Sequence, residues 1–483
     1  MNFNELIKQI EYINIFGNLP RDISTITDNS KNVEKDSLFI CVKGNTLDGN
    51  KFIKDAEVNG CAVVVSQERV DTKVCNVVVK DVKRAISQLA KAFYGNPQED
   101  IRVVGVVGTN GKTTICHVLS HLLKEGGFEV GITGTIGTYY KDKQYPTELT
   151  TPSCLNLYKL LRQMVDDGVE ILVMEVSAHA IDQRRIEGIF FHSLIFTNCT
   201  EDHLDYFEDF NRYKEVKKSL FKPDCCRYMI LNSDDQAGRE IMRSATGNVI
   251  TYGIENPADV FAINVSESER GIEYVINLCD VIYDITCNLF GKVNVYNTLA
   301  CCACSATFGI STHAIANALL KIKPIEGRAE PVATVNGCKV FIDYAHTPDG
   351  LYQTLISMKN ICRGKLYCLF GCGGNREVEK RPKMGKIAGE LADFTIITSD
   401  NPRYEDECAI IRQIEMGIKA VTHSYITIKD RKSAIRYALE KVKNGDLLLI
   451  AGKGAEKYQE RLGEKIYFSD KEEVLNYTSL TEA

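Results

Sequence analysis

The sequence has no long hydrophobic run, no internal repeat and no low-complexity tract. Its longest apolar stretches, such as Leu447 to Ala451, have the length of a strand, whereas a membrane-spanning helix needs about 20 apolar residues. Residues 1–16 are polar and acidic where a secretory signal would have a basic start and then an apolar core. These absences predict a cytoplasmic protein that is not inserted in a membrane.

An excess of positive charge is also lacking. The 58 Lys and Arg residues are mixed with 64 Asp and Glu residues, and the formal net charge is −6. A protein that binds nucleic acid usually carries a basic face, so a nucleic-acid partner is not expected. The 44% hydrophobic and 25% charged residues are typical of a globular protein. At 483 residues the chain predicts about three domains.

Cysteine is frequent, with 18 residues, but the paired CxxC sets that hold zinc are missing. Most cysteines stand among apolar residues, as Cys61 does before Ala-Val-Val-Val, where a reduced cysteine behaves as a small apolar side chain. We therefore expect reduced thiols in a cytosolic protein, and neither a zinc site nor a disulfide framework.

The hydrophobic pattern predicts an α/β protein of three domains. Residues 1–97 contain short strands and a helix over 82–94, and end at the turn cluster Gly95-Asn96-Pro97. Residues 98–328 and 329–483 each alternate strand-length apolar runs with helical stretches, which indicates βαβ units and largely parallel sheets. The expected classes are a mixed α/β domain, a P-loop-type ATPase domain and a Rossmann-like domain. The clearest expected strands are 37–42, 62–65, 75–79, 103–107, 171–176, 194–197, 228–231, 339–344, 366–370, 394–398 and 447–451, and a further helix is expected over 155–165.

The most specific local motif is a phosphate-binding loop. The strand Val103 to Val107 leads into Gly108-Thr109-Asn110-Gly111-Lys112-Thr113-Thr114, and an amphipathic helix follows. Glycines let backbone N–H groups surround phosphate oxygens, and the helix N-terminus favours negative charge. Lys112 is placed for the β and γ phosphates and the Thr113 hydroxyl for Mg²⁺. The two glycines are closer together than in the common P-loop, but the context still predicts an ATP site.

Three polar residues beyond this loop are candidates for catalysis. Glu175 lies at the end of the apolar strand 171–176 and offers the hard oxygen that Mg²⁺ prefers, although a solvated strand-end Glu is the plain alternative. His203 stands in a dense polar loop, where a metal ligand and a loop hydrogen-bonder are equally good readings. Lys217 follows on a helix, and chemistry alone would make it an exposed lysine.

Together these motifs resemble the Mur ligase family along essentially the whole chain. The resemblance rests on segments in the family's order: Gly108 to Thr114, Thr150-Thr151-Pro152, Glu175 to His179, Asp202 to Asp205, Leu289 to Asn297, Gly327-Arg328, Asp343 to Asp349, Phe370 to Gly374, Asp400 to Arg403 and Gly452 to Glu456. The resemblance implies a three-domain ATP-dependent ligase of cytoplasmic peptidoglycan synthesis that acts as a monomer.

The resemblance also implies roles for residues that match the family's motifs. The UDP-sugar and its muramoyl dipeptide would bind in the N-terminal and central domains at Ser30, Asn45, Thr46, Leu47, Thr150, Thr151, Ser177, Gln183 and Arg185. ATP would bind at Gly108 to Thr114 with Asn294, Arg328 and Asp343. The Mg²⁺ ligands would be Thr113, Glu175, His203 and Lys217, the last as an N-carbamate that turns a cation into an oxygen donor. The catalytic residues would be Lys112, Glu175, His203 and Lys217.

The implied reaction is amide formation through an acyl phosphate. The D-glutamate side-chain carboxylate of UDP-N-acetylmuramoyl-L-alanyl-D-glutamate attacks the γ-phosphate of ATP, and the amine of a diamino acid then displaces phosphate. Lys112 and Mg²⁺ would neutralise the charge that gathers on the phosphoryl oxygens.

The family's amino-acid pocket matches Arg376, Asp400, Asn401, Pro402, Arg403, Gly452 and Glu456. Arg403 can clamp a distal carboxylate in a bidentate way, which favours meso-diaminopimelate over L-lysine or another diamino acid. Three departures, Ala178, Asn375 and Ala455, replace the family's usual Ser, Asp and His, and keep L-lysine open as an alternative. A non-catalytic paralogue that binds UDP-muramoyl peptide is a further alternative, as is a P-loop kinase or motor ATPase. A folate-polyglutamate ligase shares the nucleotide motifs but lacks a UDP-sugar domain.

Overall fold

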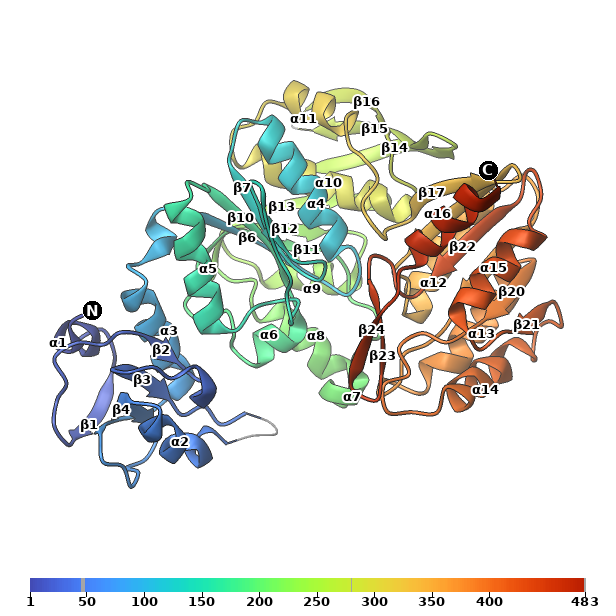
Figure 1. Cartoon of the computed structure of the whole chain (residues 1–483). Helices are drawn as coiled ribbons and strands as arrows, with labels where there is room; N and C mark the ends of the chain where they lie inside the picture. The colour runs from blue at the N-terminus through green and yellow to red at the C-terminus, as the bar shows by residue number, and fades with distance from the viewer. Residues whose placement is uncertain (45–47, 279, 482–483) are drawn as a thin grey trace. The chain divides into compact units, whose positions relative to one another are not determined.

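The computed structural model describes residues 1–44, 48–278 and 280–481, and its chain forms two compact units. The first unit comprises residues 1–105, 128–193 and 223–227, and the second comprises residues 106–127, 194–222 and 228–483. Both units combine helices with largely parallel sheets (Figure 1), so the expected α/β class is confirmed. The boundaries after residues 97 and 328 stay predictions. No helix in the described part of the chain is both long and apolar enough to cross a membrane.

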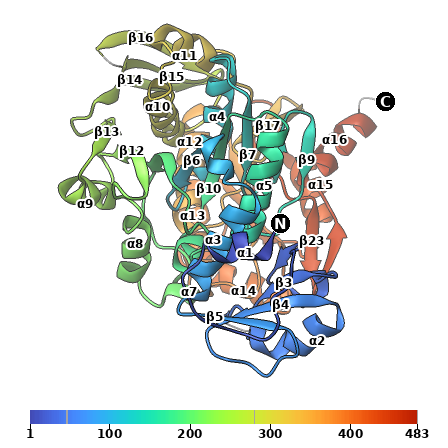
Figure 2. The ribbon, with the colours of Figure 1, turned by 90° about the vertical axis from the view of Figure 1, so that its left-hand side faces the viewer.

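A five-stranded sheet forms the N-terminal part of the first unit, in the order β1-β5-β4-β3-β2. Four of its strands are parallel, and β1 pairs with β5 in the antiparallel direction. Figure 2 shows helix α2 beside β4, where Ile53 and Ala56 pack against Phe39 and Val64. The elements are α1 Phe3–Ile7, β1 Tyr12–Phe16, β2 Ile26–Thr27, β3 Ser37–Ile40, α2 Ile53–Val58, β4 Cys61–Ser66, β5 Cys75–Val79 and α3 Val82–Phe93, with short 3-10 helices at Ser30–Asn32, Gly49–Phe52 and Pro97–Glu99.

The remainder of the first unit carries a second group of strands. Strand β10 pairs with β7 in parallel, and β8 and β9 extend this group as antiparallel neighbours. Ser153 caps the amphipathic helix α5, whose buried side includes Leu157, Leu161 and Met164. The bounds are β7 Val130–Thr133, β8 Thr138–Tyr140, β9 Lys143–Tyr145, α5 Cys154–Asp166, β10 Ile171–Val176 and α6 Ala178–Asp182; strands β6 (Arg102–Val107), β11 (Phe191–Phe196) and β12 (Cys226–Asn232) have residues in both units.

The second unit begins with helix α4, which packs against α10. Strands β12, β13 and β14 pair in parallel, but β14, β15 and β16 form an antiparallel meander that the sequence pattern did not predict. Alternation along β15 places Ile272, Tyr274 and Ile276 in the interior. The elements are α4 Lys112–Glu125, α7 Leu204–Phe207, α8 Phe210–Lys218, α9 Gln236–Ser244, β13 Asn248–Gly253, β14 Val260–Ser268, β15 Gly271–Leu278, β16 Val281–Cys287, α10 Lys292–Ala306 and α11 Thr312–Leu319.

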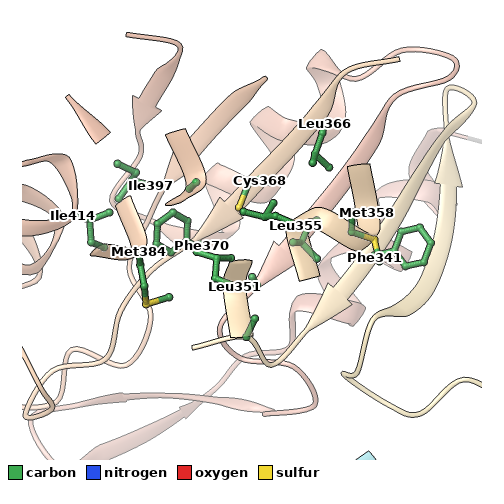
Figure 3. Packing of buried hydrophobic residues seen from close by; sticks show 14 of the residues in the cluster. Phe341, Leu351, Leu355, Met358, Leu366, Cys368, Phe370, Met384, Ile397 and Ile414 are labelled. Carbon is green, nitrogen blue, oxygen red and sulfur yellow. The ribbon is translucent and has the colours of Figure 1, made fainter. Parts of the chain in front are cut away.

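A six-stranded sheet in the order β17-β18-β22-β19-β20-β21 completes the second unit. Its central strands are parallel and hydrophobic throughout, because helices cover both faces. Figure 3 shows one face, where Cys368 and Phe370 meet Leu355 and Met384. The opposite face, which includes Leu369, packs against α15 and α16. The bounds are β17 Glu330–Val335, β18 Cys338–Asp343, α12 Pro348–Ile361, β19 Leu366–Phe370, α13 Lys380–Leu391, β20 Phe394–Ile397, α14 Glu407–Ile418, β21 Tyr425–Thr427, α15 Arg431–Lys441, β22 Leu447–Ala451, β23 Tyr458–Arg461, β24 Glu464–Tyr467 and α16 Asp470–Thr481.

The expected strands are all present, with differences at their ends. Strands β10, β19 and β22 have the predicted bounds, whereas β3 ends at Ile40 and β11 begins already at Phe191. Cys41 and Val42 leave the strand although both are apolar, because the chain turns back there and Gly49 donates a hydrogen bond to the Val42 carbonyl. The described cysteines are free thiols, most of them buried, as expected.

Candidate functional site

The phosphate loop lies between β6 and α4, and backbone geometry demands its two glycines. A Cβ atom on Gly108 would lie 1.8 Å from the Thr197 hydroxyl oxygen. Gly111 has a φ of +88°, and a Cβ there would lie 2.5 Å from Asn297 Oδ1. The loop is held from outside by the side chain of Asn198, whose Oδ1 accepts from the Asn110 N–H at 2.9 Å. A side chain at either glycine would therefore displace the loop that surrounds the predicted phosphate position.

Two lysines converge on the same loop. Lys112 Nζ donates to the carbonyl oxygens of Gly108 and Thr109 at 2.9 and 2.8 Å. Lys217 Nζ donates to the Thr109 hydroxyl at 2.8 Å. Since Thr109 also lies 3.2 Å from the Tyr213 hydroxyl, a single threonine joins the loop to helix α8. The second lysine thus lies against the phosphate loop, although more than a hundred residues separate the two in sequence.

Lys217 is buried, with a side chain only 1% exposed, so the exposed helix lysine that chemistry alone favoured is wrong. The pKa of Lys217 is lowered to about 7, mainly by burial and also by the positive charge of Lys112, against the opposing effect of nearby Cys199. The Nζ atom also lies 3.9 Å from the centre of the Tyr213 ring. A substantial fraction of this amine is therefore uncharged near neutral pH, and an uncharged amine is a nucleophile.

A cavity of about 460 Å³ opens beside the phosphate loop within the second unit. Its walls include Asn110, Gly111 and Thr114 of the loop, and also the predicted nucleotide residues Asn294, Arg328 and Asp343. Asp343 is fixed by hydrogen bonds from the Ala329 and Ala345 N–H groups at 2.7 and 2.8 Å. Burial raises the pKa of Asp343, against the effect of Arg328. The structure therefore brings six of the ten predicted nucleotide residues to a single cavity.

Two contacts link the loop to later parts of the chain. Arg328 Nη2 donates to the Thr113 hydroxyl at 2.8 Å. Asn110 Nδ2 donates to Asp349 Oδ2, also at 2.8 Å. His346 lines the same cavity; burial lowers its pKa to about 4, and its Nδ1 lies 2.8 Å from the Tyr344 carbonyl oxygen. This imidazole is therefore neutral at pH 7, with its proton on the nitrogen that faces the carbonyl.

The predicted muramoyl-dipeptide residues form a network in the first unit. The Thr151 hydroxyl donates to the Glu175 carbonyl oxygen at 2.8 Å and accepts from the Ser177 N–H at 3.0 Å. Arg185 Nη1 donates to the Thr151 carbonyl oxygen at 3.2 Å, and its Nε donates to Gln183 Oε1 at 3.0 Å. Thr150 joins through Thr135. Five predicted residues therefore share a hydrogen-bonded cluster.

Glu175 is 2% exposed, so the solvated strand-end alternative is wrong. Its carboxylate accepts from the N–H and hydroxyl of Thr135 at 2.8 and 3.1 Å. His203, on the second unit, is partly exposed and its Nε2 lies 3.4 Å from Asp202 Oδ2. Among the described residues no three His, Cys, Asp or Glu side chains form a ready metal cluster. The predicted Mg²⁺ set did not require one, because it takes two of its four donors from Thr113 and Lys217.

The donor chemistry nevertheless suits a hard cation. The Thr113 hydroxyl already accepts a hydrogen bond from the positively charged Arg328, so its oxygen faces a cation in this structure. In the second unit Lys217 would supply a carboxylate-like oxygen once a carbamate forms, and in the first unit Glu175 is itself a buried carboxylate. Oxygen donors of this kind are the ones that Mg²⁺ prefers.

The predicted amino-acid residues surround the carboxyl ends of β20 and β22. Asn401 Nδ2 donates to Glu456 Oε2 at 2.9 Å, and the fully buried Lys453 donates to both of these side chains at 3.0 and 3.1 Å. Gly452 approaches Asp400 so closely that a Cβ would lie 2.7 Å from its Oδ2. The described structure contains no hydrogen bond between the exposed Arg376 and this group.

Several residues were not assigned a role from the sequence. Asn198, Asn297, Asp349 and Lys453 contact predicted site residues, and His346 lines the cavity beside them. Most lie inside motifs that carried the family resemblance, and this was the available signal. Ser30 lies in the first unit, where its carbonyl oxygen accepts from Asn59 at 3.0 Å. The predicted sugar contacts Asn45, Thr46 and Leu47 fall outside the described residues.

Family models match three successive segments of the chain. The Mur ligase middle domain matches residues 106–305, and the Mur ligase glutamate ligase domain matches residues 327–454. Residues 22–94 match the model described as Mur ligase family, catalytic domain. The order of these segments agrees with the order of the motifs.

Curated relatives extend this likeness to nearly the full length. A UDP-N-acetylmuramoyl-L-alanyl-D-glutamate–2,6-diaminopimelate ligase from Clostridium botulinum is 38% identical over 98% of this chain and 99% of its own. A protein of the same name from Bacillus velezensis is 39% identical over 93% of both chains.

Solved structures share this fold over nearly the whole chain. A structure of a UDP-N-acetylmuramoyl-L-alanyl-D-glutamate–2,6-diaminopimelate ligase matches with a TM-score of 0.72 and 28% identity, over 100% of this chain and 99% of its own. A MurF ligase from Thermotoga maritima in complex with ADP matches with a TM-score of 0.65 and 20% identity, over 95% and 98%. The matching segments and these full-length relatives show that the chain belongs to the Mur ligase family.

Proposed function

We propose that this chain is an ATP-dependent ligase that adds meso-2,6-diaminopimelate to the D-glutamate side-chain carboxylate of UDP-N-acetylmuramoyl-L-alanyl-D-glutamate. The supporting observation is its 38% identity, along almost the entire chain, to relatives that carry this name. We place the reaction in cytoplasmic peptidoglycan precursor synthesis and expect the enzyme to act as a monomer.

The first step transfers the γ-phosphoryl group of ATP to the D-glutamate carboxylate. ATP would occupy the cavity beside Gly108–Thr114, where the loop N–H groups, Lys112 and Arg328 supply positive potential. This support comes from the geometry of the loop and from the ADP complex of the Thermotoga maritima relative. Phosphorylation converts the carboxylate into an acyl phosphate, which has a leaving group that a free carboxylate lacks. The diamino acid's amine then attacks the carbonyl carbon, phosphate departs, and the amine loses a proton.

Mg²⁺ would be held by Thr113, Glu175, His203 and Lys217, and when bound it neutralises phosphoryl charge. Lys217 can contribute only as a carbamate. Its uncharged Nζ would attack CO₂, form an N–C bond and release a proton, which leaves a carboxylate-like group at a buried position. The pKa of about 7 supports this step, because a lysine with its ordinary pKa would be almost wholly protonated at neutral pH.

The acceptor would bind between the segments 400–403 and 452–456. Glu456 would bind an ammonium group of the acceptor, Asn401 its neighbouring carboxylate, and Arg403 its distal carboxylate; the hydrogen bond between Asn401 and Glu456 supports their common assignment. L-Lysine lacks that carboxylate, so the position of Arg403 supports diaminopimelate. Ala455, which stands where the family has His, is the feature that favours L-lysine as a second candidate.

The test is phosphate release from ATP with UDP-N-acetylmuramoyl-L-alanyl-D-glutamate and meso-diaminopimelate, L-lysine or L-ornithine in parallel, with the products weighed by mass spectrometry. We expect turnover with diaminopimelate alone. Turnover with L-lysine or L-ornithine would retain the ligase chemistry and reject the acceptor. Folded protein without turnover on any acceptor would overturn the proposal in favour of a paralogue that only binds.

A further inference from the structure

Arg403 is held by several contacts to the β23–β24 hairpin, which the family motifs do not include. Strand β23 (Tyr458–Arg461) pairs with β24 (Glu464–Tyr467) in an antiparallel hairpin. The Arg403 N–H donates to the Glu460 carbonyl oxygen at 3.0 Å, and the Leu462 N–H donates to the Arg403 carbonyl oxygen at 2.8 Å. The hairpin therefore forms hydrogen bonds with both the N–H and the carbonyl oxygen of Arg403.

Glu460 also holds the side chain of this arginine. Its Oε2 accepts from Arg403 Nε at 3.1 Å, and both side chains are about one-fifth exposed, at 23% and 21%. On its other side Arg403 Nη1 donates to the Gly374 carbonyl oxygen at 2.7 Å. The Glu460 N–H donates to Asn401 Oδ1 at 3.0 Å. Glu460 thus contacts two of the predicted acceptor residues.

These contacts decide which edge of the guanidinium is available. An arginine has five N–H donors, and a carboxylate can be bound in a bidentate way at the Nε/Nη2 edge or at the Nη1/Nη2 edge. Glu460 occupies Nε, so the first edge is blocked. Within the described part of the chain, the Nη2 donors have no hydrogen-bond partner. The Gly374 carbonyl oxygen takes one of the two Nη1 donors, so the donors left for a ligand are the second Nη1 proton and those of Nη2.

We propose that Glu460 is a positioning residue for acceptor selection: it fixes Arg403 so that the Nη1/Nη2 edge faces the distal carboxylate of the diamino acid. The proposal rests on the proposed function, because it assigns Arg403 to that carboxylate. An arginine released from Glu460 would gain rotamer freedom, and ordering it again on binding would weaken recognition of the carboxylate.

The test compares the KM values for meso-diaminopimelate, UDP-N-acetylmuramoyl-L-alanyl-D-glutamate and ATP in variants of Glu460. Glu460→Met fills similar space without an acceptor oxygen, and we expect the KM for diaminopimelate to rise about tenfold, the loss of one hydrogen bond to a charged group. The KM values for UDP-N-acetylmuramoyl-L-alanyl-D-glutamate and ATP should change less than about twofold, because neither substrate is assigned to this edge of Arg403. Glu460→Gln retains an oxygen for Nε and should return the KM for diaminopimelate to near the wild-type value.

The control is Glu464→Gln, an exposed glutamate on the other strand of the same hairpin, which should leave all three KM values unchanged. A double-mutant cycle with Arg403→Ala supplies the decisive measurement. If Glu460 acts through Arg403, Glu460→Met has no further effect on the KM for diaminopimelate in the Arg403→Ala background. Glu460→Ala replaces Glu460→Met in the cycle if the latter does not fold.

The possible failures are distinguishable. Wild-type enzyme that does not use diaminopimelate would reject the proposed function. Wild-type enzyme that uses diaminopimelate, with variants that raise all three KM values equally or that add fully to Arg403→Ala, would overturn only the role of Glu460.

Discussion

Arg431 and Lys217 are both buried cations of the second unit, but only Arg431 has a carboxylate partner. Arg431 forms two bonds of 2.7 Å with Asp470, and neither side chain is exposed. Its Nη atoms also donate to the carbonyl oxygens of Ala451 and Ser399 at 3.0 and 3.4 Å. Among the described residues no carboxylate lies within ion-pair distance of Lys217 Nζ, whose described hydrogen bonds go to Thr109 and Cys199.

The two environments have opposite effects on charge. Burial acts to lower the pKa of Arg431, but Asp470 outweighs it and leaves this pKa above its ordinary value. Burial lowers the pKa of Lys217 to about 7, because the opposing effects of Cys199, Asp202 and Asp235 do not offset it. Arg431 therefore keeps its charge and braces the strand ends that precede Gly452 and Asp400. A substantial fraction of Lys217 is uncharged near neutral pH.

The largest loss of stability is expected when the ion pair between Arg431 and Asp470 is broken. Asp470→Asn leaves the Arg431 charge buried without a counter-ion, which should lower the free energy of unfolding by about 3–5 kcal/mol in denaturant titrations. The matched control is Glu473→Gln on the same helix, whose partner Lys432 is half exposed. That pair should contribute less than about 1 kcal/mol. Similar losses for the two variants would contradict the special position of Arg431.

Removal of Lys217, which has no carboxylate partner, is expected to affect catalysis. Lys217→Met should lower turnover at least about a hundredfold, because no carbamate can form. Short carboxylates should restore part of the activity in Lys217→Ala, where space is available. The neighbouring Lys218→Met, which loses ion pairs to Glu215 and Glu240, is the control and should remain active. Full activity of Lys217→Met would remove this residue from the mechanism.

The same variant should alter the pH dependence of stability. The pKa of Lys217 is about 7 in the folded chain against 10.5 as its ordinary value, so between these pH values only the unfolded chain holds the proton. Wild-type stability at this site therefore rises with pH through that window, and the full cost of burying the charge applies below pH 7. In CO₂-depleted buffer Lys217→Met should exceed wild type in Tm at pH 6 and lose that advantage towards pH 10.

Features with a local signal could be predicted from the sequence, whereas features that depend on distant residues could not. Strands such as Ile171–Val176 and Leu447–Ala451 were predictable because their apolar runs are strand-sized and bounded by turn residues. The meander Val260–Cys287 was not predicted, because its half-exposed strands contain many polar residues. At the site, Gly108–Thr114 was predictable from local spacing alone. Lys217 could be singled out only through the family resemblance, because its burial involves Thr109, which is 108 residues away in sequence.

Residues that act through other residues were the least predictable. Glu460 and Asp470 look like ordinary surface charges in the sequence, because no local signal indicates their partners. These partners, Arg403 and Arg431, lie 57 and 39 residues away. Only the return of the chain to the carboxyl ends of β20 and β22 brings these charges together.

An intermediate effect is expected at Arg403, a cation with both a partner and partial exposure. Arg403→Ala should raise the KM for meso-diaminopimelate between about tenfold and a hundredfold, since it removes a bidentate charge-assisted contact. The KM for ATP should be unaffected, because Arg403 does not line the nucleotide cavity. Small and equal changes in both KM values would reduce Arg403 to a turn residue, a role that its φ of +52° would also allow.

The smallest effect is expected at Asp349, whose carboxylate holds a neutral partner rather than a cation. Asp349→Ala removes the 2.8 Å hydrogen bond from Asn110 and should raise the KM for ATP about fivefold, which corresponds to about 1 kcal/mol. Asp349→Asn retains an acceptor oxygen and should stay near the wild-type value. The KM for the diamino acid should not change in either variant. If Asp349→Asn is as impaired as Asp349→Ala, ATP binding depends on the negative charge of Asp349 and not only on its acceptor oxygen. A charge would then matter at the phosphate loop, as it does at Arg431 and Lys217.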